Sequence, residues 1–296
     1  MKGKAFLCFA VITIALFQAC FLNRNFTFEV INDGKAVEIT GYTGKKKDVI
    51  IPMQIKKLPV TSIGENAFEE KQLTSIAIPD SVTHIKREAF AGNQLTGITI
   101  PGAVTSIGYG AFRENQLTSI TIPDGVTNID IFTFANNLLT SVTIPNSVTN
   151  IGDGAFAENQ LTAVNIPDSV IFIGDRAFAD NQLTSLVIPD SITQIGQGAF
   201  WRNQLTSVVI PDSITYIGDT AFGINQLTSV VIPGSVNHIG EGAFGINRLA
   251  TIVIGAGVYV YGWGLPSFGN GFEFFYWTNR SEAGTYTYNG GRWSVK

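Results

Sequence analysis

The chain has 296 residues and a formal net charge of −4, and it is 45% hydrophobic but only 14% charged. The apolar content is too high for a disordered chain, and the lack of excess basic charge argues against a nucleic-acid partner. The whole chain holds two histidines and two cysteines, so we expect neither a metal site nor a cofactor.

Residues 1–19 have the composition of a secretory signal peptide. Two lysines supply a basic start, and Ala5–Phe17 is an uncharged, almost wholly apolar run of 13 residues. Such a run is too short to span a bilayer but has the length of a signal-peptide core. Ala19-Cys20, which follows, resembles a bacterial lipobox. We expect lipid attachment at Cys20, with the lipid as the only contact with a membrane; the alternative is an ordinary signal peptide in which Cys20 has no role.

Residues 20–48 predict an N-terminal cap. Two segments with alternating hydrophobicity lie on either side of Asn32-Asp33-Gly34, a pattern typical of a β-hairpin. A solenoid needs specialised ends, because an open coil would expose its core.

Residues 49–255 consist of a repeated unit of 22 residues, the strongest signal in the sequence. One unit, beginning at Leu183, reads LTSLVIPDSITQIGQGAFWRNQ. Prolines recur every 22 residues from Pro79 to Pro233, and phenylalanines do so from Phe68 to Phe244. A single unit cannot bury its apolar face, so the units must stack.

Each unit begins with a strand. Leu186 and Ile188 are expected to point inward and Val187 outward, because successive strand residues face opposite sides. Pro189 ends the strand, since it cannot donate to a ladder. We expect the Ala199-Phe200 pair to bury its ring from a short helical or 3₁₀ turn.

An asparagine recurs just before each new strand, from Asn93 to Asn247. Buried amides in such a column can hydrogen-bond the loop backbones of neighbouring coils.

The unit resembles the BspA-like leucine-rich repeats, also called the Treponema pallidum type. The resemblance implies an α/β-type repeat solenoid: a β-rich, right-handed leucine-rich-repeat coil with parallel strands, here with an N-terminal hairpin cap and a small C-terminal β unit. It also implies a bacterial surface protein associated with attachment to host matrix proteins such as fibronectin, to epithelial cells or to other bacteria.

Residues 256–296 hold 12 aromatic side chains in 41 residues. A hairpin pattern at its end favours a β unit that caps the last coil. The alternative is an aromatic platform for glycans, because aromatic rings serve recognition as well as packing. Its candidate residues are Trp263, Trp277 and Trp293.

The sequence does not predict an enzyme. His84 and His238 occupy the same position of the unit seven units apart, which at the spacing of β-strands is more than about 30 Å. Cys20 would be the only cysteine of the cleaved chain. Neither a catalytic triad nor a thiol dyad can be assembled, so we expect no catalytic residue.

The outward face of the strands is where we expect binding. One outward column is hydroxylic in the early units and becomes four valines in the last four; exposed apolar strips of this kind often mark contact sites. The competing explanation is that valine simply suits a strand. Bulky residues at variable positions of the unit are further candidates. The candidate residues are Val187, Val209, Val231, Val253, Trp201, Tyr216 and Phe172.

These features predict a non-enzymatic, adhesin-like protein. It would be exported, lipid-anchored at the outer membrane or cell surface, and bound to an extracellular matrix or cell-surface protein through the repeat face. One alternative is a scaffold protein on the periplasmic side of the envelope. The other is a glycan-binding module that uses the C-terminal aromatics.

Overall fold

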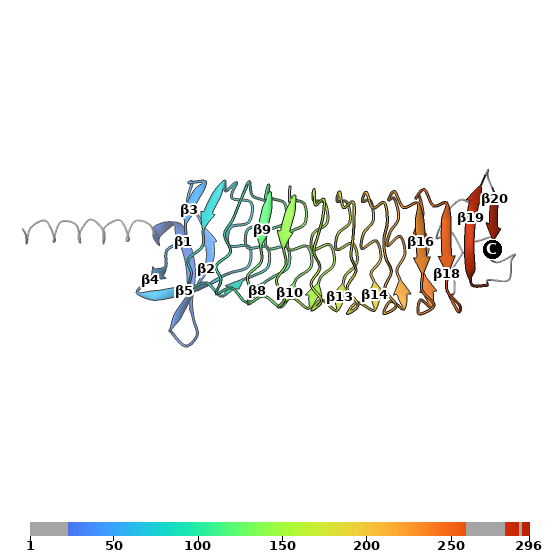
Figure 1. Cartoon of the computed structure of the whole chain (residues 1–296). Coiled ribbons are helices and arrows are strands. Elements are labelled where there is room, and N and C mark those ends of the chain that lie inside the picture. The colour runs from blue at the N-terminus through green and yellow to red at the C-terminus, as the bar shows by residue number, and fades with distance from the viewer. Residues whose placement is uncertain (1–22, 259–281, 290–291) are drawn as a thin grey trace, which may run out of the picture.

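The computed structural model describes residues 23–258, 282–289 and 292–296. Figure 1 shows an elongated solenoid, with β1 to β5 at one end and β19 and β20 at the other. Its coils stack along one axis, as expected for units that cannot bury their apolar face alone. The predicted signal peptide (1–19), Cys20, Trp263 and Trp277 lie outside the described residues.

One face of the solenoid is a parallel ladder, called the first ladder here, where the sequence predicts strands. Strands pair in register with the next coil, as Ser119 does with Ser141. Leu186, Val187 and Ile188 are 6%, 79% and 5% exposed, so the predicted alternation is confirmed. The ladder contains β3 (Asp48–Ile50), β6 (Ser75–Ala77), β9 (Ser119–Thr121), β11 (Ser141–Thr143), β16 (Ser229–Ile232), β18 (Thr251–Ile254) and a bridge between Val187 and Val209.

A second parallel ladder, which the sequence does not predict, is formed in each coil by a recurrent isoleucine and the residue before it. Tyr216 and Ile217, for example, pair with His238 and Ile239. The isoleucines are buried and, apart from buried Ser62, the residues before them are exposed or half-buried. This second ladder contains β5 (Leu58–Ile63), β7 (His84–Ile85), β8 (Ser106–Ile107), β10 (Asn128–Ile129), β12 (Asn150–Ile151), β13 (Phe172–Ile173), β14 (Gln194–Ile195), β15 (Tyr216–Ile217) and β17 (His238–Ile239).

The rest of each unit consists of turns, so the expected helical or 3₁₀ turn at each Ala-Phe pair, and with it the α/β-type class, is wrong. The one helical element among the described residues is the 3₁₀ turn η1 (Asn23–Asn25). Around Phe178, Arg176 and Asp180 have φ values of 55° and 53°, whereas a helix needs negative φ throughout. The N–H groups of these three residues donate to carbonyls of the next coil at 2.8–2.9 Å, which replaces helical bonding.

Buried phenylalanines form the centre of the core. Nine rings, from Phe68 to Phe244, are 0% exposed. Centroids of successive rings lie between 5.3 and 5.7 Å apart, and the rings are stacked. One ring per coil therefore gives a continuous aromatic column along the solenoid.

The predicted role of the asparagine column is confirmed. The Asn181 side-chain oxygen accepts the N–H of Leu161 at 3.0 Å. Its amide nitrogen donates to the carbonyls of Phe156 and Phe178 at 2.9 and 3.2 Å. Each asparagine thus satisfies backbone groups of its own coil and of the preceding one.

The predicted N-terminal hairpin is confirmed. Strands β1 (Phe26–Ile31) and β2 (Ala36–Tyr42) pair antiparallel, and β2 also pairs with β5, in the parallel direction. The rings of Phe26 and Tyr42 pack on Phe68 at centroid distances of 6.2 and 5.7 Å, so the hairpin covers the first ring of the aromatic column. Strand β4 (Gln54–Ile55) adds a short antiparallel pairing to β5.

The C-terminal end is closed by a mixed sheet, as the predicted β unit requires. Strand β19 (Gly284–Asn289) pairs antiparallel with β18 and with β20 (Arg292–Val295). Tyr286 of β19 is 0% exposed and Trp293 of β20 is 8% exposed. These two side chains join the same core cluster as the repeats.

Candidate binding surfaces

The valine column lies on the first ladder and faces outward. Val187, Val209 and Val231 are 79%, 76% and 58% exposed, and Val187 and Val209 are bridged across neighbouring coils. Val253, in β18, is half-buried. Strand β18 pairs edge to edge with β19, where Thr285 lies opposite Val253. The exposed apolar strip, called the valine strip here, therefore consists of three residues: Val187, Val209 and Val231.

Hydroxyl groups surround this strip. Thr184 and Ser185 are exposed in the same coil as Val187. In earlier coils the position of the valines is held by exposed Thr121 and Thr143. The face therefore changes along the solenoid axis from hydroxylic to apolar.

Phe172 and Tyr216 do not join the valine strip, because both belong to the second ladder. Phe172 is 50% exposed beside Ile171, which is 60% exposed. Tyr216 stacks on His238, with ring centroids 4.7 Å apart and an interplanar angle of 3°. Partial burial, assisted by the charges of Asp219 and Asp175, raises the pKa of Tyr216. The phenol is therefore neutral at physiological pH.

Trp201 lies on the turn side of the solenoid, the side formed by the turns around each Ala-Phe pair, and it is half-buried. The guanidinium groups of Arg176 and Arg202 lie 5.6 and 5.1 Å from the ring centroid. Arg202 also pairs with Asp180 at 3.2 Å. This ring is held by its own chain's charges, on a different side of the solenoid from the valine strip.

Of the proposed glycan platform, the structure describes only Trp293. Its ring is 8% exposed and tilted against Tyr288 at a centroid distance of 5.1 Å. Such burial leaves little of the ring for a sugar to stack on. Trp263 and Trp277, which lie outside the described residues, stay predicted candidates.

The described residues include no group of three or more His, Cys, Asp or Glu side chains arranged to hold a metal ion. His84 and His238 lie in β7 and β17, near opposite ends of the second ladder. Within the same described ranges, no helix is long and apolar enough to cross a bilayer.

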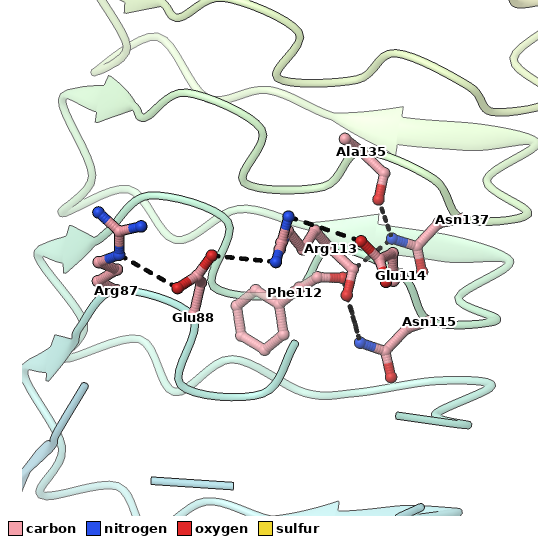
Figure 2. Close-up of polar contacts among 8 residues, drawn as sticks. All are labelled: Arg87, Glu88, Phe112, Arg113, Glu114, Asn115, Ala135 and Asn137. Carbon is pink, nitrogen blue, oxygen red and sulfur yellow. Dashed lines mark hydrogen bonds and ion pairs between the residues drawn. The ribbon is translucent and has the colours of Figure 1, made fainter. Parts of the chain in front are cut away.

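A charged cluster on the turn side escaped the sequence analysis. Figure 2 shows Glu88 between two arginines: its carboxylate oxygens lie 3.1 Å from Nε of Arg87 and 3.1 Å from Nη2 of Arg113. Glu88 is 8% exposed. A side chain on Gly110 would meet Cδ of Arg113 at 2.9 Å, so this glycine makes room for the pair. The sequence signal for this cluster is Glu88 itself, which stands at a position where every second unit, from Gly110 to Gly242, carries glycine.

Comparison with known proteins gives the family. The model of the BspA type leucine rich repeat region, present in 6 copies, matches residues 61–183 and 149–263. No curated protein is significantly similar to this chain.

Among solved structures, the pneumococcal vaccine antigen PcpA is 19% identical, with a TM-score of 0.51 over 79% of this chain and 81% of that one. A leucine-rich repeat protein from Eubacterium ventriosum is 21% identical, with a TM-score of 0.50 over 80% and 71%. A leucine rich cell surface protein from Faecalibacterium prausnitzii is 24% identical, with a TM-score of 0.43 over 79% and 93%. The family model covers more than half of the chain, which therefore belongs to the BspA-type leucine-rich-repeat family.

Proposed function

We propose that this protein is an exported, lipid-anchored binding protein of the bacterial cell surface. In this proposal the first ladder attaches, without catalysis, to an extracellular protein of the host matrix or of another cell. The observation that carries the proposal is the valine strip, which exposes three large apolar side chains in a row on a regular face.

Strand preference alone does not account for these valines. Valine and threonine are both β-branched and both suit a strand. Threonine holds the same position in the coils of β9 and β11. Exchanging hydroxyls for methyl groups in consecutive coils adds apolar surface that water disfavours. A protein partner that covers this surface recovers about 25 cal/mol for each Å² of apolar area removed from water.

The neighbouring hydroxyls complement the strip. Thr184 and Ser185 are exposed beside Val187 and supply donors and acceptors at its rim, which is the usual arrangement of a protein interface. A strip this narrow supports modest affinity per molecule, and many anchored copies on one cell raise the total by multivalency.

The test uses beads coated with the mature chain and three kinds of target: fibronectin, epithelial cells and other bacteria. A triple variant, Val187→Thr, Val209→Thr and Val231→Thr, keeps the β-branched shape and introduces the residue found at Thr143. We expect wild-type beads to bind at least one target and the triple variant to lose most of that binding. Phe172→Asn, on the second ladder, is the matched control and should bind as the wild type does.

Two results would count against the proposal. One is wild-type beads that bind no target above uncoated beads. The other is a triple variant that binds as well as the wild type while the unfolding curves of both proteins coincide.

A further inference from the structure

Charge is distributed unequally along the solenoid axis. Residues 23–57, which form its N-terminal end, carry seven Lys and Arg against four Asp and Glu, a net charge of +3. Residues 58–258, which form the coils, carry seven against seventeen, a net charge of −10. The molecule therefore has a basic end and an acidic body.

The basic charge is concentrated in two exposed loops of that end. Lys45, Lys46 and Lys47 link β2 to β3, and Lys56 and Lys57 form the turn between β4 and β5. No described carboxylate forms an ion pair with these five lysines. Lys47 Nζ donates to the carbonyl of Lys71 at 2.8 Å, a bond that does not neutralise its charge, so the positive charge of all five lysines is available to an external partner.

Contacts within the cap keep both loops beside the start of the described chain. The N–H of Thr43, just before the lysine loop, donates to the carbonyl of Asn25 at 2.8 Å. The ammonium group of Lys56 lies 5.1 Å from the ring centroid of Phe28 in β1. Figure 1 shows β1, β3 and β4 together at this end of the solenoid.

The same end exposes apolar side chains. Ile50 and Met53, which follow the lysine loop, are 70% and 68% exposed, and Val30 of β1 is 47% exposed. Exposed apolar groups among lysines are typical of surfaces that lie in the headgroup region of a membrane, where the apolar groups enter the interface and the lysines meet anionic lipids.

Chain length connects this end to the predicted lipid. Only three residue steps separate Cys20 from Asn23, the first described residue, and an extended chain spans about 10 Å over that distance. If Cys20 is acylated, Asn23 lies within that reach of the bilayer, which places the N-terminal end of the solenoid next to the membrane.

We propose that the N-terminal end of the solenoid binds the anionic phospholipid headgroups of the bilayer that holds Cys20. The acidic coils are repelled by the same headgroups, so the solenoid projects away from the bilayer and presents its first ladder to partners. The identity of this bilayer rests on the proposed lipid anchor, whereas the affinity of the surface for anionic lipid does not.

The experiment uses the chain from residue 20 with Cys20→Ser, which cannot be acylated, and vesicles of phosphatidylcholine with and without phosphatidylglycerol. We expect co-sedimentation only with vesicles that contain phosphatidylglycerol, and its loss at high salt. The triple variant Lys45→Gln, Lys46→Gln and Lys47→Gln should weaken binding by at least about tenfold, since each lysine near an anionic surface contributes about fivefold.

The matched control removes three positive charges from the other end of the solenoid, by Arg248→Gln, Arg292→Gln and Lys296→Gln, and should bind as the parent does. Equal binding to both kinds of vesicle, or equal loss in the two triple variants, would overturn the proposal. Because no acyl group is present, these results do not depend on whether Cys20 is lipidated in the cell.

A labelling experiment tests the orientation. In the same Cys20→Ser chain, Met53→Cys or Val209→Cys gives a single thiol for a fluorophore, because the sequence has no cysteine after residue 20. Nitroxide-labelled lipids should quench the label at position 53 and leave that at position 209 unaffected. Quenching of position 209 as strong as that of position 53 would show that the solenoid lies flat and would overturn the upright arrangement.

Discussion

The asparagine column allows a quantitative test of how the coils are held together. In Asn181→Ala, the N–H of Leu161 loses its acceptor. The Phe156 carbonyl, however, keeps a second donor in Asn159 at 3.2 Å, and the Phe178 carbonyl keeps Asn203 at 2.9 Å. The Ala179 carbonyl, which also accepts from Asn181, keeps the N–H of Glu158 at 3.0 Å. One buried N–H is thus left without a partner while all three carbonyls stay satisfied. We expect a loss of about 2–3 kcal/mol in the free energy of unfolding.

The shared carbonyl predicts that neighbouring asparagines are coupled. In the double variant Asn159→Ala, Asn181→Ala, the Phe156 carbonyl loses both of its donors. The double variant should therefore lose about 1 kcal/mol more than the sum of the single losses. Asn137 and Asn181 share no carbonyl, so their double variant should be additive.

Urea unfolding followed by circular dichroism measures these free energies, with Gln182→Ala as an exposed control that should change stability by less than about 0.5 kcal/mol. The reasoning would be refuted by an Asn181→Ala loss no greater than that of the control. It would also be refuted if the losses in the free energy of unfolding were as additive for Asn159 and Asn181 as for Asn137 and Asn181.

Three further predictions concern other positions. Ile246 has φ 56° and is 74% exposed. Because a β-branched residue is strained at positive φ, Ile246→Asn should stabilise the fold by about 1 kcal/mol in thermal unfolding. The reverse exchange at the equivalent position of another unit, Asn136→Ile, should destabilise the fold, and a stabilisation there would contradict this reasoning. Gly154 has φ 59°, and a Cβ there would meet ring carbons of Phe132 at 2.3 and 2.4 Å, so Gly154→Ala should cost about 2 kcal/mol or more, part of it restored by Phe132→Ala in a double-mutant cycle. Hydrogen bonds from Ser75 and Thr74 lower the pKa of Asp48, so the ionised carboxylate stabilises the fold above its unfolded pKa, and this stabilisation is lost as the pH falls through the folded pKa. An NMR titration should show that the Asp48 pKa rises in Ser75→Ala. An unchanged pKa would exclude the hydrogen bond from Ser75.

The sequence predicts those features that depend on a pattern repeated in every unit. Inward Leu186 and Ile188, outward Val187 and the asparagine column all follow from period-2 alternation and the period of 22. The second ladder could not be predicted in this way, because all of its strands after β5 are two residues long. Two residues are too few to display an alternation.

The turn side was mispredicted because the residues at its left-handed positions differ from unit to unit. Gly154 and Gly198 signal a positive φ, but Arg176 occupies the same position between them. The helix expectation for the Ala-Phe pair rested on local sequence, whereas hydrogen bonds to the next coil determine the backbone there.

Exposure of Val187 could be predicted from alternation, but the separation of the candidate residues could not. Phe172 and Tyr216 are close to the valines in sequence, and only the turn between the two ladders places them on another side. The alternation within one strand predicts which side chains are exposed. Predicting which exposed side chains lie on the same surface requires the path of the chain around the whole coil.

The measurement that tests the proposed function most directly is protease shaving of intact producing cells, combined with the intact mass of the mature chain. We predict a mass that includes a lipid-modified Cys20 and rapid loss of the full-length chain from intact cells. An unmodified Cys20 would contradict the lipid anchor. Complete protection from protease would contradict surface display and would favour a scaffold on the periplasmic side of the envelope.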